Sequence, residues 1–354
     1  MATTLTAVEA DTVSATPGTG RQFWSMITRS KWVTAGLIIF AIYLLIAIFG
    51  PMLAPYAPGA ITITSNGGAF TGTSFQNNTV MVGPSLHHLL GTTGTGEDVL
   101  SQMLVSFGPS LEVGFLAGGV ATALSIIIGV SAGYYAGNAG EVLSLISNIF
   151  LVIPALPLLV VISALDSLAP IWVYALVLAA LGWAWGARVL RAQTIALAQQ
   201  DFVLAAKASG ESAWRIVVFE ILPNEMPVVA TSFVYTVVGA ISGYVTLCFL
   251  GLINVSVVNF GTMLFNVQQT GGFSDGAWWW YVPPGLAVAI ILLGLVMLNF
   301  GIDEFINPRL RAAGISRKEM RSGNKQYGIT PVVRNRPVPA VADGEAIGSA
   351  RRTK

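Results

Sequence analysis

Six long runs of apolar residues constrain the fold of this chain more than any other feature. A helix needs about 20 predominantly apolar residues to cross a bilayer, whereas membrane-spanning strands show alternating segments of about ten residues. The runs in this chain are continuous and do not alternate. The sequence therefore predicts an all-α integral membrane protein with six transmembrane helices, at Trp32–Leu53, Leu111–Tyr135, Val142–Leu165, Ile171–Arg188, Met226–Leu250 and Val282–Gly301.

The composition agrees with a membrane protein and excludes several other classes. Charged residues make up 10% of the chain and hydrophobic residues 54%, whereas a soluble domain carries about 25% charged residues. Such an apolar chain cannot be intrinsically disordered as a whole. A single cysteine excludes a disulfide scaffold and a cysteine-rich metal site.

The positions of the positive charges predict the topology. All 18 Lys and Arg residues lie in three zones, Arg21–Lys31, Arg188–Arg215 and Arg309–Lys354. Basic loops remain on the cytoplasmic side of a membrane. Six spans with both termini in the cytoplasm place all three zones on that side. An odd number of spans is the alternative, because Gly182 and Gly186 interrupt the short fourth run.

This topology divides the chain into three parts. Residues 1–30 are expected to form a cytoplasmic tail, residues 31–312 the six-helix transmembrane domain, and residues 313–354 a disordered cytoplasmic tail. Residues 54–107 form a long extracytoplasmic loop, in which Glu97–Leu104 is predicted to be a short amphipathic helix. Residues 191–225 form the main cytoplasmic loop.

Motifs for catalysis, nucleotide binding and metal binding are missing from the sequence. Gly91–Gly96 is rich in glycine but lacks the Gly-Lys-Ser/Thr end of a phosphate-binding loop. His87 and His88 are neighbours whose side chains would diverge on a helix, and Cys248 is best explained as a small packing residue. We therefore expect no catalytic residue, no metal and no cofactor site in this chain.

Carboxylates at the middle of a span mark proton and ion pathways. The acidic residues that the predicted spans contain or border are all expected near span ends, which argues against an ion-coupled carrier. A sodium site built from backbone carbonyls would escape this test. These residues are Glu112, Glu141, Asp166, Glu225, Asp303 and Glu304.

The cytoplasmic loop between the fourth and fifth spans predicts two short helices that project from the membrane. Asp201 is a suitable N-cap for an alanine-rich helix over Phe202–Ser209, and Gly210 is suited to end it. A second helix is expected from Glu211 to Pro223, where proline would stop it. The small side chains of the first helix let another protein approach closely. An ordinary interfacial helix is the alternative.

This loop resembles the "EAA" motif of ABC-type importer permeases, in which Glu-Ala-Ala is followed by a glycine and later by Leu-Pro. The matching positions are Ala205, Ala206, Gly210, Leu222 and Pro223. Leu204 stands where the family has its glutamate, and Asp201, three residues earlier, is an alternative source of charge. In that family the motif is the coupling helix that fits into a cleft of the ATPase subunit.

Further strings extend the resemblance to the C-type permease subunit of the dipeptide/oligopeptide/nickel importers. The family strings "LGTDxxGRDVLSR", "FLGLG", "WGxML" and "DPRLR" resemble Leu90–Ser101, Phe249–Leu252, Phe260–Met263 and Asn307–Arg311. Glu97 and Gln102 replace arginines of the first string, so any role of those arginines is absent here.

The resemblance implies a type I ABC importer permease fold in a bacterial plasma (inner) membrane. It also implies four kinds of partner: a second homologous permease subunit that forms a heterodimer with this chain, two cytoplasmic ATPase subunits, an extracytoplasmic solute-binding protein and the lipid bilayer, with no nucleic acid. ATP and Mg would bind to the ATPase subunits. Peptides are the usual substrates of the family, and nickel and oligosaccharides are alternatives.

The substrate path is not predicted by any diagnostic cluster. Polar residues of the spans are unranked candidates: Asn148, Ser163, Thr231, Tyr235 and Asn299. Trp278–Tyr281 is better explained as an interfacial aromatic belt than as a sugar-stacking site. Two other classes remain as alternatives, an ATP-independent secondary carrier or channel, and a membrane anchor without transport.

Overall fold

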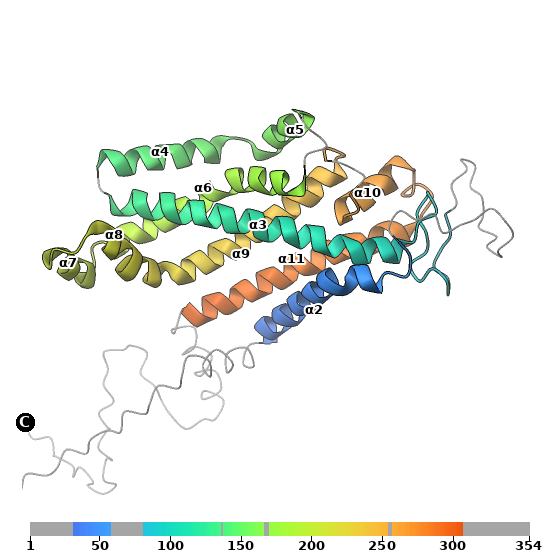
Figure 1. The fold of residues 1–354 in the computed structure, drawn as a ribbon, viewed down its shortest axis with the longest axis horizontal. Helices are drawn as coiled ribbons and strands as arrows, with labels where there is room; N and C mark the ends of the chain where they lie inside the picture. Colours follow the sequence, from blue (N-terminus) through green and yellow to red (C-terminus); the bar gives the residue numbers. More distant parts are fainter. Residues whose placement is uncertain (1–30, 58–80, 136, 166–169, 254–256, 307–354) are drawn as a thin grey trace, which may run out of the picture. The chain divides into compact units, whose positions relative to one another are not determined.

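The computed structural model describes residues 31–57, 81–135, 137–165, 170–253 and 257–306. Several predictions concern residues outside these ranges: the tails 1–30 and 313–354, Asp166 and the Asn307–Arg311 string. Every regular element within them is a helix, as predicted (Figure 1). In chain order the helices are α2 (Lys31–Leu53), α3 (Val99–Tyr134), α4 (Asn138–Val152), α5 (Ala155–Leu165), α6 (Ile171–Leu197), α7 (Asp201–Ala208), α8 (Ala213–Arg215), the π-helix η1 (Ile216–Ile221), α9 (Leu222–Phe249), α10 (Phe260–Gln269) and α11 (Trp278–Ile306).

Five helical segments of the described residues are long and apolar enough to cross a membrane. They are α2, α3, α6, α11 and the continuous segment Ala213–Phe249. The pair α4 and α5 makes a sixth only if it is counted as one broken span, because its halves are bent by 76°. The prediction of six spans therefore depends on this pair.

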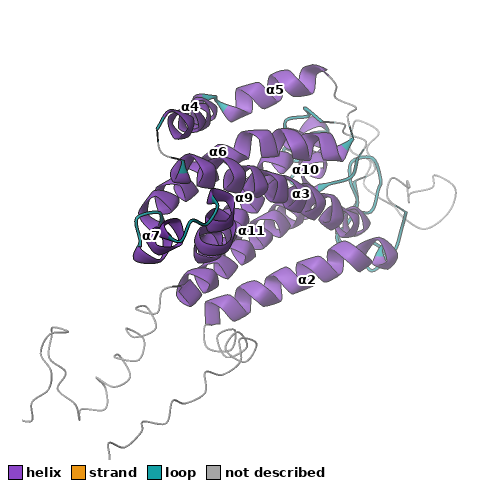
Figure 2. Cartoon of the chain, turned by 60° about the vertical axis from the view of Figure 1, so that its left-hand side comes forward, coloured by secondary structure: helices purple, strands orange, loops and turns teal. Residues whose placement is uncertain are grey.

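The predicted unbroken helix over Val142–Leu165 is wrong, and a proline explains the break. Ile153 has an extended backbone (φ −64°, ψ 121°) directly before Pro154. Proline disfavours helical geometry in the residue before it and lacks the N–H that a continuous helix needs. The chain turns there, and α5 leaves the direction of α4 (Figure 2).

The second span also begins earlier than predicted, at Val99 instead of Leu111. Asp98 is the N-cap, and its side chain accepts a hydrogen bond from the backbone N–H of Ser101. Glu97–Leu104 is therefore not a separate amphipathic helix, because most of it forms the first turns of α3. Glu112, which was expected next to the start of this span, lies in the interior of α3, so the prediction that it is near a span end is wrong.

Small residues let α3 pack closely against α6 and α9. A Cβ atom added at Gly129 would lie 2.5 Å from the carbonyl oxygen of Ala187 on α6. At Gly118 it would lie 2.5 Å from a side-chain methyl of Val237 on α9. Such close backbone approach is how helices gain packing energy inside a bilayer. α3 thus lies at the centre of the bundle (Figure 1).

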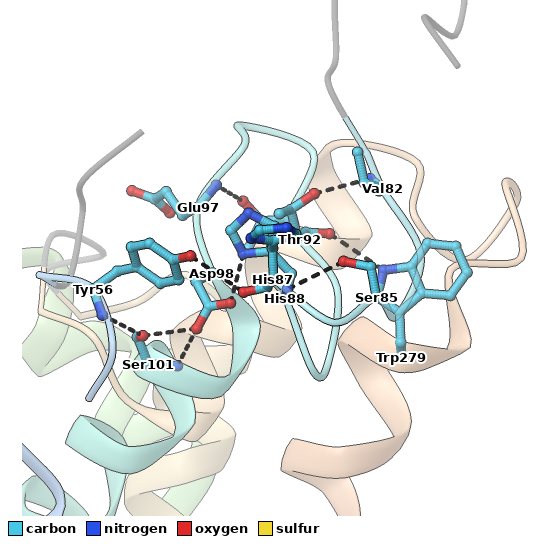
Figure 3. A network of polar contacts seen from close by, with 11 residues as sticks. Tyr56, Val82, Ser85, His87, His88, Thr92, Glu97, Asp98, Ser101 and Trp279 are labelled. Carbon is cyan, nitrogen blue, oxygen red and sulfur yellow. Dashed lines mark hydrogen bonds and ion pairs between the residues drawn. The ribbon is translucent and has the colours of Figure 1, made fainter. Parts of the chain in front are cut away.

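At the end of the bundle near α10, a polar network joins the starts of α3 and α11 to the end of α2 (Figure 3). His88 Nδ1 lies 2.9 Å from Asp98 Oδ1, and both side chains are buried. Asp98 Oδ2 also accepts hydrogen bonds from Ser101 N and Oγ, at 2.8 and 2.7 Å. Ser101 Oγ in turn accepts one from the backbone of Tyr56, and Trp279 donates one to the carbonyl of Thr92. The network fixes the loop before α3.

We predict that His88→Ala destabilises the protein by about 1–3 kcal/mol, because it leaves a buried carboxylate oxygen of Asp98 without its partner. The midpoint of thermal unfolding and the rate of proteolysis between residues 81 and 98 would measure this. His87→Ala is the matched control, since this adjacent side chain is exposed. Equal effects of the two substitutions would contradict the structural role of the His88–Asp98 pair.

Candidate coupling site

The first half of the loop that the basic zones place in the cytoplasm forms the predicted helix and ends as predicted. α7 runs from Asp201 to Ala208, and Gly210 has a positive φ of 81°. Gly210 N donates to the carbonyl of Lys207 and Glu211 N to that of Ala206, at 3.1 and 3.2 Å. This pair of bonds is a Schellman motif, in which a left-handed residue closes the helix. One prediction is wrong: the N-cap is Gln200, and Asp201 is the first helical residue.

The second half of the loop does not stop at Pro223. α8 continues through η1 into α9, so Ala213–Phe249 forms one helical segment. Leu222 N bonds to the carbonyl of Val217, five residues back, which is the wider π-helical spacing. Pro223 lies in the first turn of α9, directly after this change of spacing. A missing N–H is tolerated there, so proline does not end the helix.

α7 is anchored by one face and exposes the other. Val203 is fully buried in an apolar cluster with Ile216 and Ile221, and the half-buried Ala206 and Leu222 pack against the same cluster. Lys207 Nζ lies 5.0 Å above the ring of Tyr134, at the cytoplasmic end of α3 in the predicted topology. Figure 2 shows α7 at the end of the bundle opposite α10.

Most of the predicted site residues are exposed, whereas Ala206 and Leu222 are half-buried. Leu204 is 49% exposed, and Asp201, Ala205, Gly210 and Pro223 are also exposed. Three large apolar side chains that the motif did not identify join them: Phe202, Trp214 and Phe219 are 40%, 63% and 61% exposed. Their signal in the sequence is the presence of aromatic residues in a loop that the basic zones place in the cytoplasm.

A buried polar contact connects the start of α9 to α6. Glu225 is 1% exposed, and its Oε1 lies 2.6 Å from Thr194 Oγ1. Thr194 Oγ1 also lies 2.9 Å from the carbonyl of Leu190 in its own helix. Glu225 is in the first turn of α9 but inside the continuous segment Ala213–Phe249, so its position near a span end stays a prediction. The contact therefore joins α6 to the helical segment that follows α7.

The unranked path residues do not form one site. Asn148 lines a groove of about 550 Å³ together with Asn138, Glu141 and Arg191, and none of the other four line it. Tyr235 is 52% exposed on α9, whereas Asn299 is 2% exposed. Ser163 donates to the carbonyl of Val160, and Thr231 is half-buried. Among the described residues, no group of three or more His, Cys, Asp or Glu side chains could hold a metal ion.

We predict that Thr194→Val destabilises the bundle by about 1–3 kcal/mol, because it leaves the buried carboxyl of Glu225 without a hydrogen bond. Thr246→Val is the matched control, since Thr246 Oγ1 bonds to the Ser242 carbonyl of its own helix. Thermal unfolding in detergent measures both variants. The double variant Thr194→Val with Glu225→Leu completes the test. If its loss in free energy of unfolding equals the sum of the losses of the two single variants, the contact does not couple α6 to α9.

Two family models match the chain. Residues 125–312 match the binding-protein-dependent transport system inner membrane component, and residues 18–68 match the N-terminal transmembrane domain of oligopeptide transport permease C. The first match contains the whole coupling site, from α7 to the start of α9, and most of the bundle around it.

Relatives match over four-fifths of the chain. A dipeptide transport system permease protein of Alkalihalophilus pseudofirmus is 30% identical over 294 residues, which are 82% of this chain and 90% of the relative. The corresponding protein of Bacillus subtilis is 29% identical over 81% of this chain and 85% of its own length. A probable D,D-dipeptide transport system permease protein of Escherichia coli is 27% identical over 80% and 90%.

The helical bundle, the projecting α7 and these matches agree with one another. The first family model spans more than half of the chain, and the second extends the likeness to the first helix. The chain therefore belongs to the family of binding-protein-dependent transport system inner membrane components, as a C-type permease subunit of an ABC transporter.

Proposed function

We propose that this chain is the membrane-spanning permease subunit of an ATP-driven, binding-protein-dependent importer, and that α7 couples it to the ATPase. The observation that carries the proposal is the form of the coupling site. An exposed helix, anchored through Val203, is joined by Gly210 to a segment that continues into α9. A rigid connection of this kind can transmit movement of a docked partner into the membrane.

The partner that α7 fits is the cleft of an ATPase subunit, two of which would bind ATP and Mg. ATP binding moves the permease only if the docked surface makes different contacts in the two conformational states of the permease. The apolar side chains of Phe202, Leu204 and Trp214 supply surface whose burial can differ between those states. The permease then alternates between inward- and outward-facing forms by rigid-body movement.

The remaining partners follow from family membership. They are a second, homologous permease subunit and a solute-binding protein on the outer face. This arrangement requires α7 and both termini in the cytoplasm, which is the topology that the basic zones predict. The absence of catalytic groups in this chain is part of the same proposal, since the ATPase subunits hydrolyse ATP.

We propose peptides as the transported solute, because the names of the relatives refer to dipeptides or di/tripeptides. ATP-dependent uptake of a labelled dipeptide into vesicles that contain the complete transporter would measure this. We expect accumulation only when ATP, the ATPase subunits and the solute-binding protein are all present. Accumulation without the ATPase would instead support the secondary carrier, and uptake of nickel or oligosaccharides alone would correct the substrate.

We predict that Gly210→Val lowers ATP-driven uptake about tenfold or more, because a β-branched residue at a φ of 81° strains the turn. The altered turn changes the angle at which α7 meets its partner. Gly210→Asn should retain most uptake, since asparagine tolerates the left-handed region.

A second glycine provides the matched control for this substitution. Gly137 precedes α4 with a φ of 85°, and a Cβ atom added at Gly137 or Gly210 would meet no atom within 4 Å. With a ψ of −154°, Gly137 has a conformation that is essentially restricted to glycine, so Gly137→Val introduces at least as much strain in a turn outside the coupling site. Normal assembly and uptake for Gly210→Val, or an equal loss for Gly137→Val, would contradict the coupling role of Gly210.

A further inference from the structure

A groove of about 550 Å³ between α4 and α6 lies outside the coupling site. α4 runs alongside α6 (Figure 1), and each helix contributes one charged side chain to the groove, Glu141 and Arg191. The other polar side chains that line it are two amides and a hydroxyl, those of Asn138, Asn148 and Ser144. This set of side chains can bind a ligand that carries both a negative and a positive charge.

Arg191 is the side chain of the groove that most requires a partner. Its Nε is buried, and it has no hydrogen-bond acceptor among the described residues. No described carboxylate forms an ion pair with it either, although Glu141 lines the same groove. A guanidinium that is removed from water is unfavourable without an anion, and its planar N–H groups fit a carboxylate or a phosphate. The groove therefore offers Arg191 to an anionic group of a ligand.

Glu141 lies at the same level of the bundle as Arg191 without pairing with it. A Cβ atom added at Gly133 of α3 would lie 2.8 Å from the carbonyl oxygen of Arg191. One added at Gly140 would contact the carbonyl oxygen of Tyr135. Both charged residues are therefore beside the end of α3, yet no oxygen of Glu141 lies within 4.0 Å of the guanidinium nitrogens. A ligand that contacts both needs an anionic group and, a short distance away, a cationic group.

The groove is at the depth of the lipid headgroups. Arg191 follows Ile171, the first residue of α6, by about 30 Å along the helix axis at a rise of about 1.5 Å per residue. This length matches the thickness of the hydrocarbon core, so a helix that enters the core at Ile171 leaves it near Arg191. Arg191 also belongs to the basic zone Arg188–Arg215, which the charge rule places on the cytoplasmic side.

The exposed side chains of α4 change from polar to apolar with increasing depth. Glu141 is in the first turn of α4, and the exposed amide of Asn148 lies about two turns deeper. Leu145, Ile149 and Val152 are 59%, 53% and 83% exposed. A phospholipid has the same order of groups, a charged headgroup, polar glycerol esters and apolar chains. A dipeptide has charges at both ends and no long apolar chain, so it matches this surface less well.

The balance of charge selects among phospholipids. One cation and one anion line the groove, so its charged side chains have no net charge. A headgroup whose only charge is a phosphate would bring that phosphate close to the carboxylate of Glu141, and like charges repel. A headgroup with a phosphate and a primary ammonium satisfies both side chains, because the ammonium donates hydrogen bonds to the carboxylate. A quaternary ammonium has no N–H and cannot do so.

We propose that the groove between α4 and α6 is a binding site for one phospholipid whose headgroup carries a primary ammonium. The phosphate pairs with Arg191 and the ammonium with Glu141. The glycerol esters lie toward the amide of Asn148, and the acyl chains follow the exposed apolar side chains of α4. This site is separate from α7, and it does not depend on which solute the protein carries.

Native mass spectrometry of the full chain with added phospholipids of matched acyl chains tests the selectivity. We expect phosphatidylethanolamine to bind about tenfold more tightly than phosphatidylcholine or phosphatidylglycerol, the ratio expected from one charge-assisted hydrogen bond. Equal binding of the three lipids would overturn the proposal. Displacement of phosphatidylethanolamine by a dipeptide would also overturn it, because the groove would then be a peptide site.

Two substitutions separate the roles of the charged side chains. Arg191→Gln should weaken the binding of phosphatidylethanolamine and phosphatidylcholine alike, about tenfold or more, because it removes the partner of the phosphate. Glu141→Gln should weaken only phosphatidylethanolamine, and this exposed residue can be replaced without disturbing the packing of α4. It therefore tests the proposal even where Arg191→Gln does not fold.

A neighbouring arginine supplies the matched control. Arg188 is exposed on α6 and does not line the groove, so Arg188→Gln should leave the binding of both lipids unchanged. An effect of Arg188→Gln as large as that of Arg191→Gln would show that the lipids respond only to the general positive charge of this face. That result, or unchanged lipid selectivity in Glu141→Gln, would contradict the proposed site.

Discussion

In a bilayer, apolar side chains gain nothing by leaving lipid for a neighbouring helix, so close packing has to hold the bundle together. The contacts of α3 show how this chain satisfies that constraint. Its glycines lie directly against the backbone of α6 and the side chains of α9, where a single methyl group would clash. Because α2 packs on the same helix, the positions of the other elements depend on α3.

The candidate coupling site is exposed on one face and held by an apolar cluster on the other. α7 buries Val203 and half-buries Ala206, while Leu204 and Trp214 remain exposed. The segment after Gly210 is helical from α8 through η1 to α9, and the π-helical turn accommodates Pro223 without a break. A partner that moves α7 would therefore act on a long helix. The Thr194–Glu225 contact adds α6 to the elements that such a movement reaches.

The correct predictions are those that depend on local sequence. The helix of α7, its end at Gly210 and the apolar runs depend on nearby residues, and the structure confirms them. Predictions made from single residues were less accurate. Pro154 breaks the third run and Pro223 does not end a helix, although both are prolines in apolar surroundings. The difference lies in the hydrogen-bond spacing around each proline, which hydropathy does not report.

The sequence by itself determined that the chain lies in a lipid bilayer, that it is helical and which loop resembles a coupling motif. These follow from apolar runs and motif spacing, which are properties of the linear chain. The place of Glu112 in the interior of α3, the burial of Glu225 and the exposed apolar side chains around α7 were decided only by the tertiary structure. Each depends on which helix stands opposite a residue. Whether a side chain is buried or exposed depends on contacts with residues that are distant in the sequence. A one-dimensional pattern does not contain these contacts.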